Sequence, residues 1–247
     1  MAEELLIIGG SAEAHAFARQ CPQARAVLPG PLRSDPGGVA YEILSEWSAE
    51  AIVSDAQGPV ILATHPCDDA LYDTLPQRCA ALGRPLIILQ RPGWQAGPGD
   101  QWHMLSRDGD VGATIPDGAR VFVGLGRSVA ALEHLLEGRY LVIRQLRARG
   151  ELYAGEGHFL DGDAPFTVEH EIAMLRAERI DWLLLRNAGG QGSAPKLKAA
   201  RALGLPIAML PRPDLPESVP VVETPEALLD MLARREAGVG ASQYAPD

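Results

Sequence analysis

The chain has 247 residues, of which 47% are hydrophobic, and this is enough to bury the core of one large α/β domain or of two small ones. The formal net charge of −10 argues against a nucleic-acid binder, and three cysteines scattered without a CxxC pair argue against a disulfide framework and a structural zinc site. The first residues carry acid rather than base and no apolar segment is long enough to span a bilayer, so we expect a cytoplasmic protein without nucleic-acid or membrane partners; a monomer is compatible with the sequence.

Apolar runs of strand length alternate with helical stretches along the first part of the chain. This alternation is typical of a parallel sheet covered by helices. A passage rich in glycine and proline follows, and then a polar stretch that ends at Gly118. In this half we expect strands at residues 5–8, 25–28, 59–63 and 85–90, and helices at residues 11–20, 38–47 and 68–82.

The same alternation restarts after Gly118 and continues almost to the end of the chain. The fold class that follows is α/β, with two Rossmann-like parallel-sheet domains facing a central cleft, at residues 1–118 and 119–247. In the second half we expect strands at residues 120–123, 140–144, 181–186 and 206–210, and helices at residues 128–136, 166–179, 194–203 and 225–235.

The most informative segment is a strand–turn–helix–strand unit at residues 180–213. Its turn contains Asn187, Gly189 and Gly190, and glycine gives the backbone conformations that other residues avoid. The helix that follows carries Lys196 in its first turn. Main-chain N–H groups at a helix start, with a lysine beside them, form a natural site for a phosphate or a carboxylate. This segment therefore indicates an anion-binding turn.

Two more glycine-rich turns follow predicted strands. Gly9 and Gly10 come after the first strand, and Ser11 can cap the next helix. The run GLGRS at residues 124–128 follows the first strand of the second half. None of these turns is a GxGxxG in the correct register, and one such turn alone is weak evidence for phosphate contact. Three of them in two facing sheets favour a dinucleotide that bridges the cleft between the domains.

Six segments, taken together and in order, resemble the precorrin-6A reductases of cobalamin biosynthesis. They are LLIIGGSAEA (5–14), ATHPCD (63–68), LQRPGW (89–94), VFVGLGRS (121–128), APFTVEHEIAMLRAERID (164–181) and RNAGGQGSAPKLKAARALGLPIAMLPRP (186–213). The resemblance implies two Rossmann-like domains whose sheets exchange a strand. It also implies an NADPH-dependent oxidoreductase that reduces one ring double bond of a corrin precursor, as in the conversion of precorrin-6A to precorrin-6B. The substrate would be a tetrapyrrole with many carboxylates, and no metal is implied because the corrin precursor of the aerobic route is metal-free at this step.

The cofactor contacts that we predict lie in the three turns. Arg127 and Ser128 are the leading candidates for the 2′-phosphate of NADPH, because a guanidinium and a hydroxyl at a helix N-terminus both donate hydrogen bonds to phosphate. A solvated arginine at a helix start is the alternative. The other predicted cofactor contacts are Gly9, Gly10, Ser11, Gly124, Gly126, Asn187, Gly189, Gly190 and Lys196.

His65 is the candidate proton donor, because it follows a strand end and imidazole titrates near neutral pH. Its alternative role is to order its own loop. With Cys67 and Asp68 it also suggests a metal cluster, but ligands this close in sequence rarely converge without a distant partner, so we predict no metal site. The candidate contacts to substrate carboxylates and polar groups are Thr64, Arg144 and Arg186.

Two further patterns have a structural reading beside the functional one. The run Glu169-His170-Glu171 lies on a predicted helix where successive residues face different ways, and we expect it to be a solvated face. Trp94 and Trp102 either flank a flat macrocycle or anchor loops against the core, and anchoring is the commoner role of tryptophan.

Several positions depart from the motifs of the family that the chain resembles. The loop at residues 28–38 is shorter, and Leu62, Asp163 and Arg186 stand where the family has aspartate, arginine and lysine. Two of these differences remove or reverse charge. The alternative to a precorrin-6A reductase is therefore a non-catalytic or substrate-shifted paralogue that binds nucleotide, tetrapyrrole or both.

Overall fold

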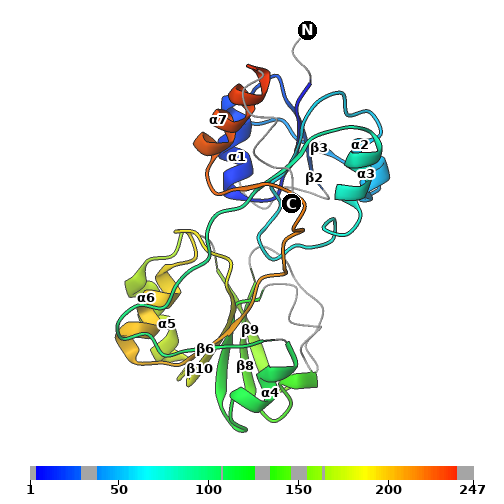
Figure 1. Cartoon of the computed structure of the whole chain (residues 1–247). Helices are drawn as coiled ribbons and strands as arrows, with labels where there is room; N and C mark the ends of the chain where they lie inside the picture. Colours follow the sequence, from blue (N-terminus) through cyan, green and yellow to red (C-terminus); the bar gives the residue numbers. More distant parts are fainter. Residues whose placement is uncertain are drawn as a thin grey trace. The chain divides into compact units, whose positions relative to one another are not determined.

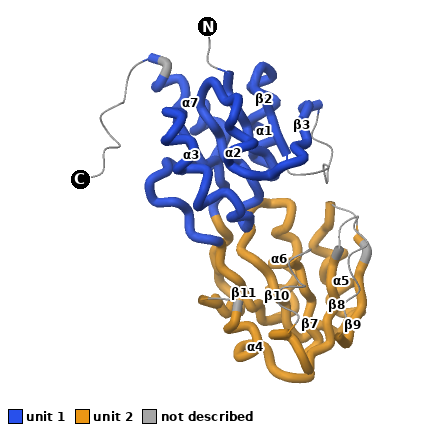
Figure 2. The backbone as a smooth tube through the Cα atoms, turned by 90° about the vertical axis from the view of Figure 1, so that its right-hand side faces the viewer, with its two compact units in different colours: residues 1–92, 213–247 blue, residues 93–212 orange. Residues whose placement is uncertain are grey.

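The computed structural model describes residues 4–28, 38–106, 108–125, 134–145, 155–162 and 165–237. The chain divides into two compact units (Figure 2). Unit 1 comprises residues 1–92 and 213–247, and unit 2 comprises residues 93–212. Each unit contains a parallel sheet of six strands within the described residues, so the predicted α/β class with two parallel-sheet domains is confirmed.

The sheet of unit 1 has helices on both faces, because its strands are apolar on both sides. The strands, in sheet order, are β3 (Glu42–Ile43), β2 (Arg25–Leu28), β1 (Leu6–Ile8), β4 (Val60–Leu62), β5 (Leu86–Leu89) and β12 (Val221–Val222). The helices are α1 (Ala12–Gln20), α2 (Ala49–Val53), α3 (Leu75–Ala81) and α7 (Pro225–Glu236). Leu6 and Ile8 face the layer that contains α2 and α3, whereas Ile7 faces the layer that contains α1 and α7 (Figure 1).

Unit 2 repeats this architecture. The strands, in sheet order, are β9 (Gly157–Asp161), β8 (Tyr140–Gln145), β7 (Arg120–Val123), β10 (Trp182–Arg186), β11 (Ile207–Leu210) and β6 (Trp102–Met104). The helices are α4 (Val111–Thr114), α5 (Val168–Ala177) and α6 (Pro195–Leu203), and a 3₁₀ turn spans Asp108–Asp110. Helices α5 and α6 pack together on one face of the sheet, where Leu175 and Leu197 meet Leu183. Short helical turns around Val111 cover the other face.

The sixth strand of each sheet, β12 in unit 1 and β6 in unit 2, follows a strand of the other unit in the chain. This is the strand exchange that the resemblance implied. After β5 the chain enters unit 2 and pairs β6 with β11, and after β11 it returns to unit 1 and pairs β12 with β5. The division of the chain consequently differs from the expected domains at residues 1–118 and 119–247. Residues 93–118 belong to unit 2 and residues 213–237 to unit 1, because these edge strands pair there.

Residues 38–47 do not form the predicted helix. Glu42 and Ile43 instead form β3, in parallel register with Val27 and Leu28. The helix begins later, at α2, because the hydroxyl of Ser48 accepts a hydrogen bond from the N–H of Ala51 at 3.2 Å and caps it. The predicted helix at residues 128–136 lies largely outside the described residues. No helix in the described part of the chain is long and apolar enough to cross a membrane.

Candidate functional site

The strand order reverses within each sheet. Apart from the exchanged edge strands β12 and β6, both sheets have the order 3-2-1-4-5 when counted from β3 or from β9, so the reversal falls between β1 and β4 in unit 1 and between β7 and β10 in unit 2. In open parallel sheets, ligands bind beyond the carboxyl ends of the strands at this point. The predicted site residues that the structure describes lie at the carboxyl ends of strands at or next to these two places, or in the turns and helices that follow them.

In unit 1 the two glycines after β1 allow a close approach between turns. A Cβ on Gly10 would lie 3.3 Å from the Cα of Thr64, and a Cβ on Gly9 would lie 2.6 Å from the ring of Tyr41. Gly10 also has a φ of +145°, which side chains rarely adopt. Ser11 caps α1, because its hydroxyl accepts a hydrogen bond from the N–H of Ala14 at 3.1 Å. The structure therefore brings Gly9, Gly10, Ser11 and the buried Thr64 together.

His65 lies beside this turn, and its side chain is exposed. Its ring Nδ1 accepts a hydrogen bond from the N–H of Cys67 at 3.3 Å, and its carbonyl accepts one from Asp68 at 2.8 Å. His65 thus helps to order its own loop, and proton transfer by its exposed imidazole stays a prediction. No group of three or more histidine, cysteine, aspartate or glutamate side chains in the described residues is arranged to hold a metal ion.

Two pairs near the first turn were not predicted from the sequence. The hydroxyl of Tyr41 and Nδ1 of His15 lie 2.8 Å apart, and burial lowers the pKa of His15 and raises the pKa of Tyr41 to about 12. Arg91 and Glu13 form a mostly buried ion pair at 2.6 Å. Glu13 and Arg91 lie in two of the segments that resemble the family. The sequence did not show that the two residues pair, because that depends on β1 and β5 lying in one sheet.

In unit 2 the turn after β7 begins with Gly124. A Cβ at this position would lie 2.6 Å from the side chain of Leu185, so glycine lets the turn approach β10. The N–H of Gly124 donates to the carbonyl of Leu184 at 3.0 Å. Arg127 and Ser128, the candidates for the 2′-phosphate, lie outside the described residues, and so does Gly126, another predicted cofactor contact.

The turn between β10 and α6 contains a row of main-chain N–H groups that donate to no acceptor in the described part of the chain. Gly189 and Gly190 have φ values of +67° and +81°, which glycine adopts without strain. Within the described residues, the main-chain N–H groups from Gly189 to Ser193 have no hydrogen-bond partner. Gly189 is nevertheless buried, and buried N–H groups are almost always paired. Such a row, directly before a nine-residue helix, fits an anionic ligand.

The side chain of Asn187 is directed at Trp94 rather than into this row. Its Oδ1 accepts a hydrogen bond from the N–H of Trp94 at 2.7 Å, and its Nδ2 donates to the carbonyl of Trp94 at 2.9 Å. Asn187 therefore orders the turn, and the donors left for a ligand are the main-chain N–H groups from Gly189 to Ser193. Trp94 and Trp102 both pack against the core of unit 2, which is the anchoring role.

Arg144 is held in a buried ion pair. Its two terminal nitrogens lie 2.5 and 3.1 Å from the two carboxylate oxygens of Glu171, and its guanidinium lies over the rings of Phe122 and Phe166. Glu171 is 1% exposed, so the expectation that residues 169–171 form one solvated face is wrong for this residue. The rotation of the helix places Glu171 on its buried side, where the carboxylate pairs with the guanidinium of Arg144 at the end of β8. The guanidinium of Arg144, which was predicted to contact a substrate, is therefore already paired with the carboxylate of Glu171.

Lys196 lies beside this pair in the first turn of α6. Its side chain is partly buried, and burial lowers the pKa of its ammonium to about 8, with the positive charge of Arg144 acting in the same direction and Glu171 opposing. The ammonium is still mostly protonated at neutral pH. Arg186, at the end of β10, is half-buried next to the same turn and is engaged in an interaction of its own. Lys196 thus adds a positive charge to the turn of unpaired N–H groups.

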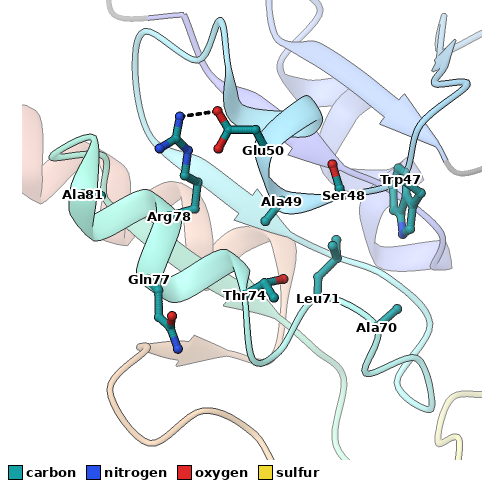
Figure 3. Close-up of a pocket in the computed structure, with 10 residues that line it drawn as sticks. All are labelled: Trp47, Ser48, Ala49, Glu50, Ala70, Leu71, Thr74, Gln77, Arg78 and Ala81. Carbon is teal, nitrogen blue, oxygen red and sulfur yellow. Dashed lines mark hydrogen bonds and ion pairs between the residues drawn. The ribbon is translucent and has the colours of Figure 1, made fainter.

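A separate groove of about 590 Å³ lies between α2 and α3 in unit 1 (Figure 3). The side chains of Arg78 and Glu50 face each other across it at 2.5 Å, and the groove leaves neither charge unpaired. None of the predicted site residues lines it. The groove therefore offers no charge for a polycarboxylate. Its lining residues are Trp47, Ser48, Ala49, Glu50, Ala70, Leu71, Thr74, Gln77, Arg78 and Ala81.

Two parallel sheets that share the strand order 3-2-1-4-5, with glycines after the strands at both points of reversal, define the class of the protein as Rossmann-like. The family model described as precorrin-6x reductase CbiJ/CobK matches residues 4–233. The precorrin-6A reductase of Rhodococcus erythropolis is 32% identical over 231 residues, covering 89% of this chain and 93% of that protein. The precorrin-6A reductase of Mycobacterium tuberculosis H37Rv is 34% identical over 237 residues, with the same shares covered.

A solved structure described as CobK precorrin-6A reductase has a TM-score of 0.84 and 27% sequence identity, and the match covers 95% of this chain and 98% of that one. The chain therefore belongs to the precorrin-6x reductase family, as the motifs indicated. It is a reductase, and the reductases of this family use a nicotinamide cofactor.

Proposed function

We propose that the protein reduces precorrin-6A with NADPH in cobalamin biosynthesis, the substrate for which its relatives are named. The observation that supports this most directly is the row of unpaired N–H groups before α6, in a chain that matches the family over nearly its whole length. When bound, the nicotinamide would supply a hydride to one carbon of the tetrapyrrole, and the neighbouring carbon would take a proton.

The residues after β10 fit a phosphate of the cofactor. The N–H groups of Gly189 and Gly190 would donate to its oxygens, and the ammonium of Lys196 would add a charge-assisted hydrogen bond. Arg127 and Ser128 remain our candidates for the 2′-phosphate. The carboxylate that acts on Lys196 is that of Glu171. Because Arg144 neutralises Glu171, this carboxylate does not repel a phosphate bound beside Lys196.

The residues of unit 1 fit a different part of the reaction. Gly9, Gly10 and Ser11 present the start of α1, and Thr64 and His65 follow β4 beside them. We assign Thr64 and Arg186 to substrate contacts and His65 to proton transfer as proposals. Arg144 supports the site from inside the sheet through Glu171, rather than as a free cation.

The direct test is to incubate the purified protein with precorrin-6A and NADPH and to record the absorption spectrum of the tetrapyrrole together with oxidation of the cofactor. We expect the spectral change that a known precorrin-6A reductase produces, and a much slower reaction with NADH. An unchanged spectrum, under conditions in which the reference enzyme converts its substrate, would overturn the assignment.

The two lysines of the chain provide a matched test of the cofactor site, because Lys196 is partly buried in the first turn of α6 and Lys198 is exposed on the same helix. Lys196→Met should raise the dissociation constant for NADPH about tenfold or more, since a hydrogen bond to a charged group contributes about 1.5–3 kcal/mol. Lys198→Met should leave it unchanged. Equal effects of the two substitutions would remove Lys196 from the cofactor site.

A further inference from the structure

The chain passes between the two units at two places, and both are tied to one residue. It enters unit 2 at Pro92–Gly93 and leaves it at Arg212–Pro213. These two connections, green and orange in Figure 1, are separated by more than a hundred residues of unit 2. Asn187, at the end of β10, forms hydrogen bonds with residues next to both.

The side chain of Asn187 binds the entering connection. A carboxamide has both an acceptor and a donor, and here they meet the N–H and the carbonyl of the same residue, Trp94, at 2.7 and 2.9 Å. The preceding residue is glycine, and a Cβ on Gly93 would lie 3.2 Å from both polar atoms of the carboxamide. The indole Nε1 of Trp94 donates to the carbonyl of Gly190 at 2.8 Å, which fixes the same segment to the turn once more.

The main chain of Asn187 binds the end of β11 and the leaving connection that follows it. Its N–H donates to the carbonyl of Leu210 at 3.1 Å, and its carbonyl accepts a hydrogen bond from Nε of Arg212 at 2.6 Å. Arg212 is the last residue of unit 2 before the chain returns to unit 1. One residue thus uses its N–H, its carbonyl and both side-chain polar atoms on two segments that are distant in sequence.

We propose that Asn187 is a positioning residue, which holds both connections against the end of β10 and so fixes the turn at residues 187–190. It acts through Trp94 and Arg212 rather than by touching cofactor or substrate. A reductase needs its bound groups aligned within a fraction of an ångström, and a turn anchored at four points meets that need. The inference deepens the proposed function, since it concerns the turn that we assign to the cofactor phosphate.

Asn187 is the only asparagine in the chain, so its side chain can be observed alone. Protein labelled with an isotope in asparagine carboxamide nitrogen should give a single pair of side-chain N–H signals. We expect the hydrogen donated to the carbonyl of Trp94 to exchange with solvent at least about tenfold more slowly than in a free amide, because hydrogen-bonded groups exchange through opening. Trp94→Phe, which removes the bond to Gly190 and keeps an aromatic ring against the core, should speed this exchange, whereas Trp47→Phe in unit 1 should not.

Kinetics separate positioning from direct contact. If Asn187 acts through Trp94, then Asn187→Ala and Trp94→Phe should each lower kcat/KM by about tenfold, and the double variant should be little worse than the stronger single variant. Their far-ultraviolet circular dichroism should match that of the wild type. A direct ligand would give a different pattern, with a large loss in Asn187→Ala, no loss in Trp94→Phe and simple additivity.

The two proposals fail in distinguishable ways. Fast exchange of the Asn187 carboxamide in the wild type, or a Trp94→Phe variant with unchanged exchange and unchanged kcat/KM, overturns the positioning role even if precorrin-6A is reduced. Slow exchange that Trp94→Phe abolishes supports the positioning role even if precorrin-6A is not the substrate, because the exchange measurement needs no reaction.

Discussion

Lys196 should make the protein more stable as the pH rises above neutrality. A lysine whose pKa is raised by an ion pair has the opposite effect. Burial lowers the pKa of its ammonium from 10.5 to about 8. Between these two values the unfolded chain binds a proton that the folded chain has already released, so the free energy of unfolding should rise with pH across this window. The difference corresponds to an upper limit of about 3 kcal/mol. Because the side chain keeps some contact with solvent, we expect about 1–2 kcal/mol.

The assay is urea unfolding of the wild type, Lys196→Met and Lys198→Met at several values between about pH 7 and about pH 10. At neutral pH, Lys196→Met should be more stable than the wild type, because it removes the cost of a buried charge. That advantage should shrink as the pH rises through 8, while Lys198→Met should run parallel to the wild type. A constant difference between the wild type and Lys196→Met over this range would refute a lowered pKa for Lys196.

Three further outcomes follow from the structure and the sequence. Glu171→Gln leaves the buried guanidinium of Arg144 without its charged partner and should lower the free energy of unfolding by about 3–5 kcal/mol in a urea titration; a loss below about 1 kcal/mol would show that the pair is not buried as described. Gly157→Ala would place a Cβ 2.1 Å from the carbonyl oxygen of Leu141, so the thermal midpoint should fall by about 5 °C or more, and an unchanged midpoint would contradict the pairing of β8 with β9. Arg127→Ala should weaken NADPH about tenfold and NADH hardly at all, and equal losses in titrations of both cofactors would remove Arg127 from the 2′-phosphate.

The strands that were predictable from the sequence are those whose side chains are buried among apolar residues on both faces of the sheet. β1 and β10 are continuous apolar runs, because helices cover both sides of a parallel sheet. Helix α6 was predictable for a local reason as well, since Pro195 suits its first turn and Gly204 ends it with a φ of +65°. In these elements the local preference and the final environment agree.

The edge strands could not be predicted from local sequence. β12 is two residues long, and β6 exposes His103 and Met104, so neither has an apolar run or a period to detect. Their extended conformation comes from pairing with β5 and β11, which are distant in the chain. Only the resemblance to a family with exchanged strands pointed to them.

The candidate site was predictable in its backbone but not in its side-chain pairs. Glycines after strands marked the turns, because their conformational freedom is a local property. The partners of Arg144 and Asn187 were not visible, since Glu171 and Trp94 lie on elements that only the folded sheet brings near. A buried cation gives no local signal of which carboxylate will neutralise it.

The departures from the family motifs do not all bear on the substrate. Leu62 stands where the family has an aspartate, but it lies in β4, is 2% exposed and packs with Leu6 and Ile8 in the core of unit 1. An aspartate there would be a buried charge, so the change alters packing rather than the charge that a tetrapyrrole meets. Arg186, by contrast, keeps the positive charge of the lysine that it replaces, beside the turn with unpaired donors. Within the described residues these two departures therefore leave the cationic character of the proposed site intact, and they favour a retained reductase over a paralogue with a different substrate.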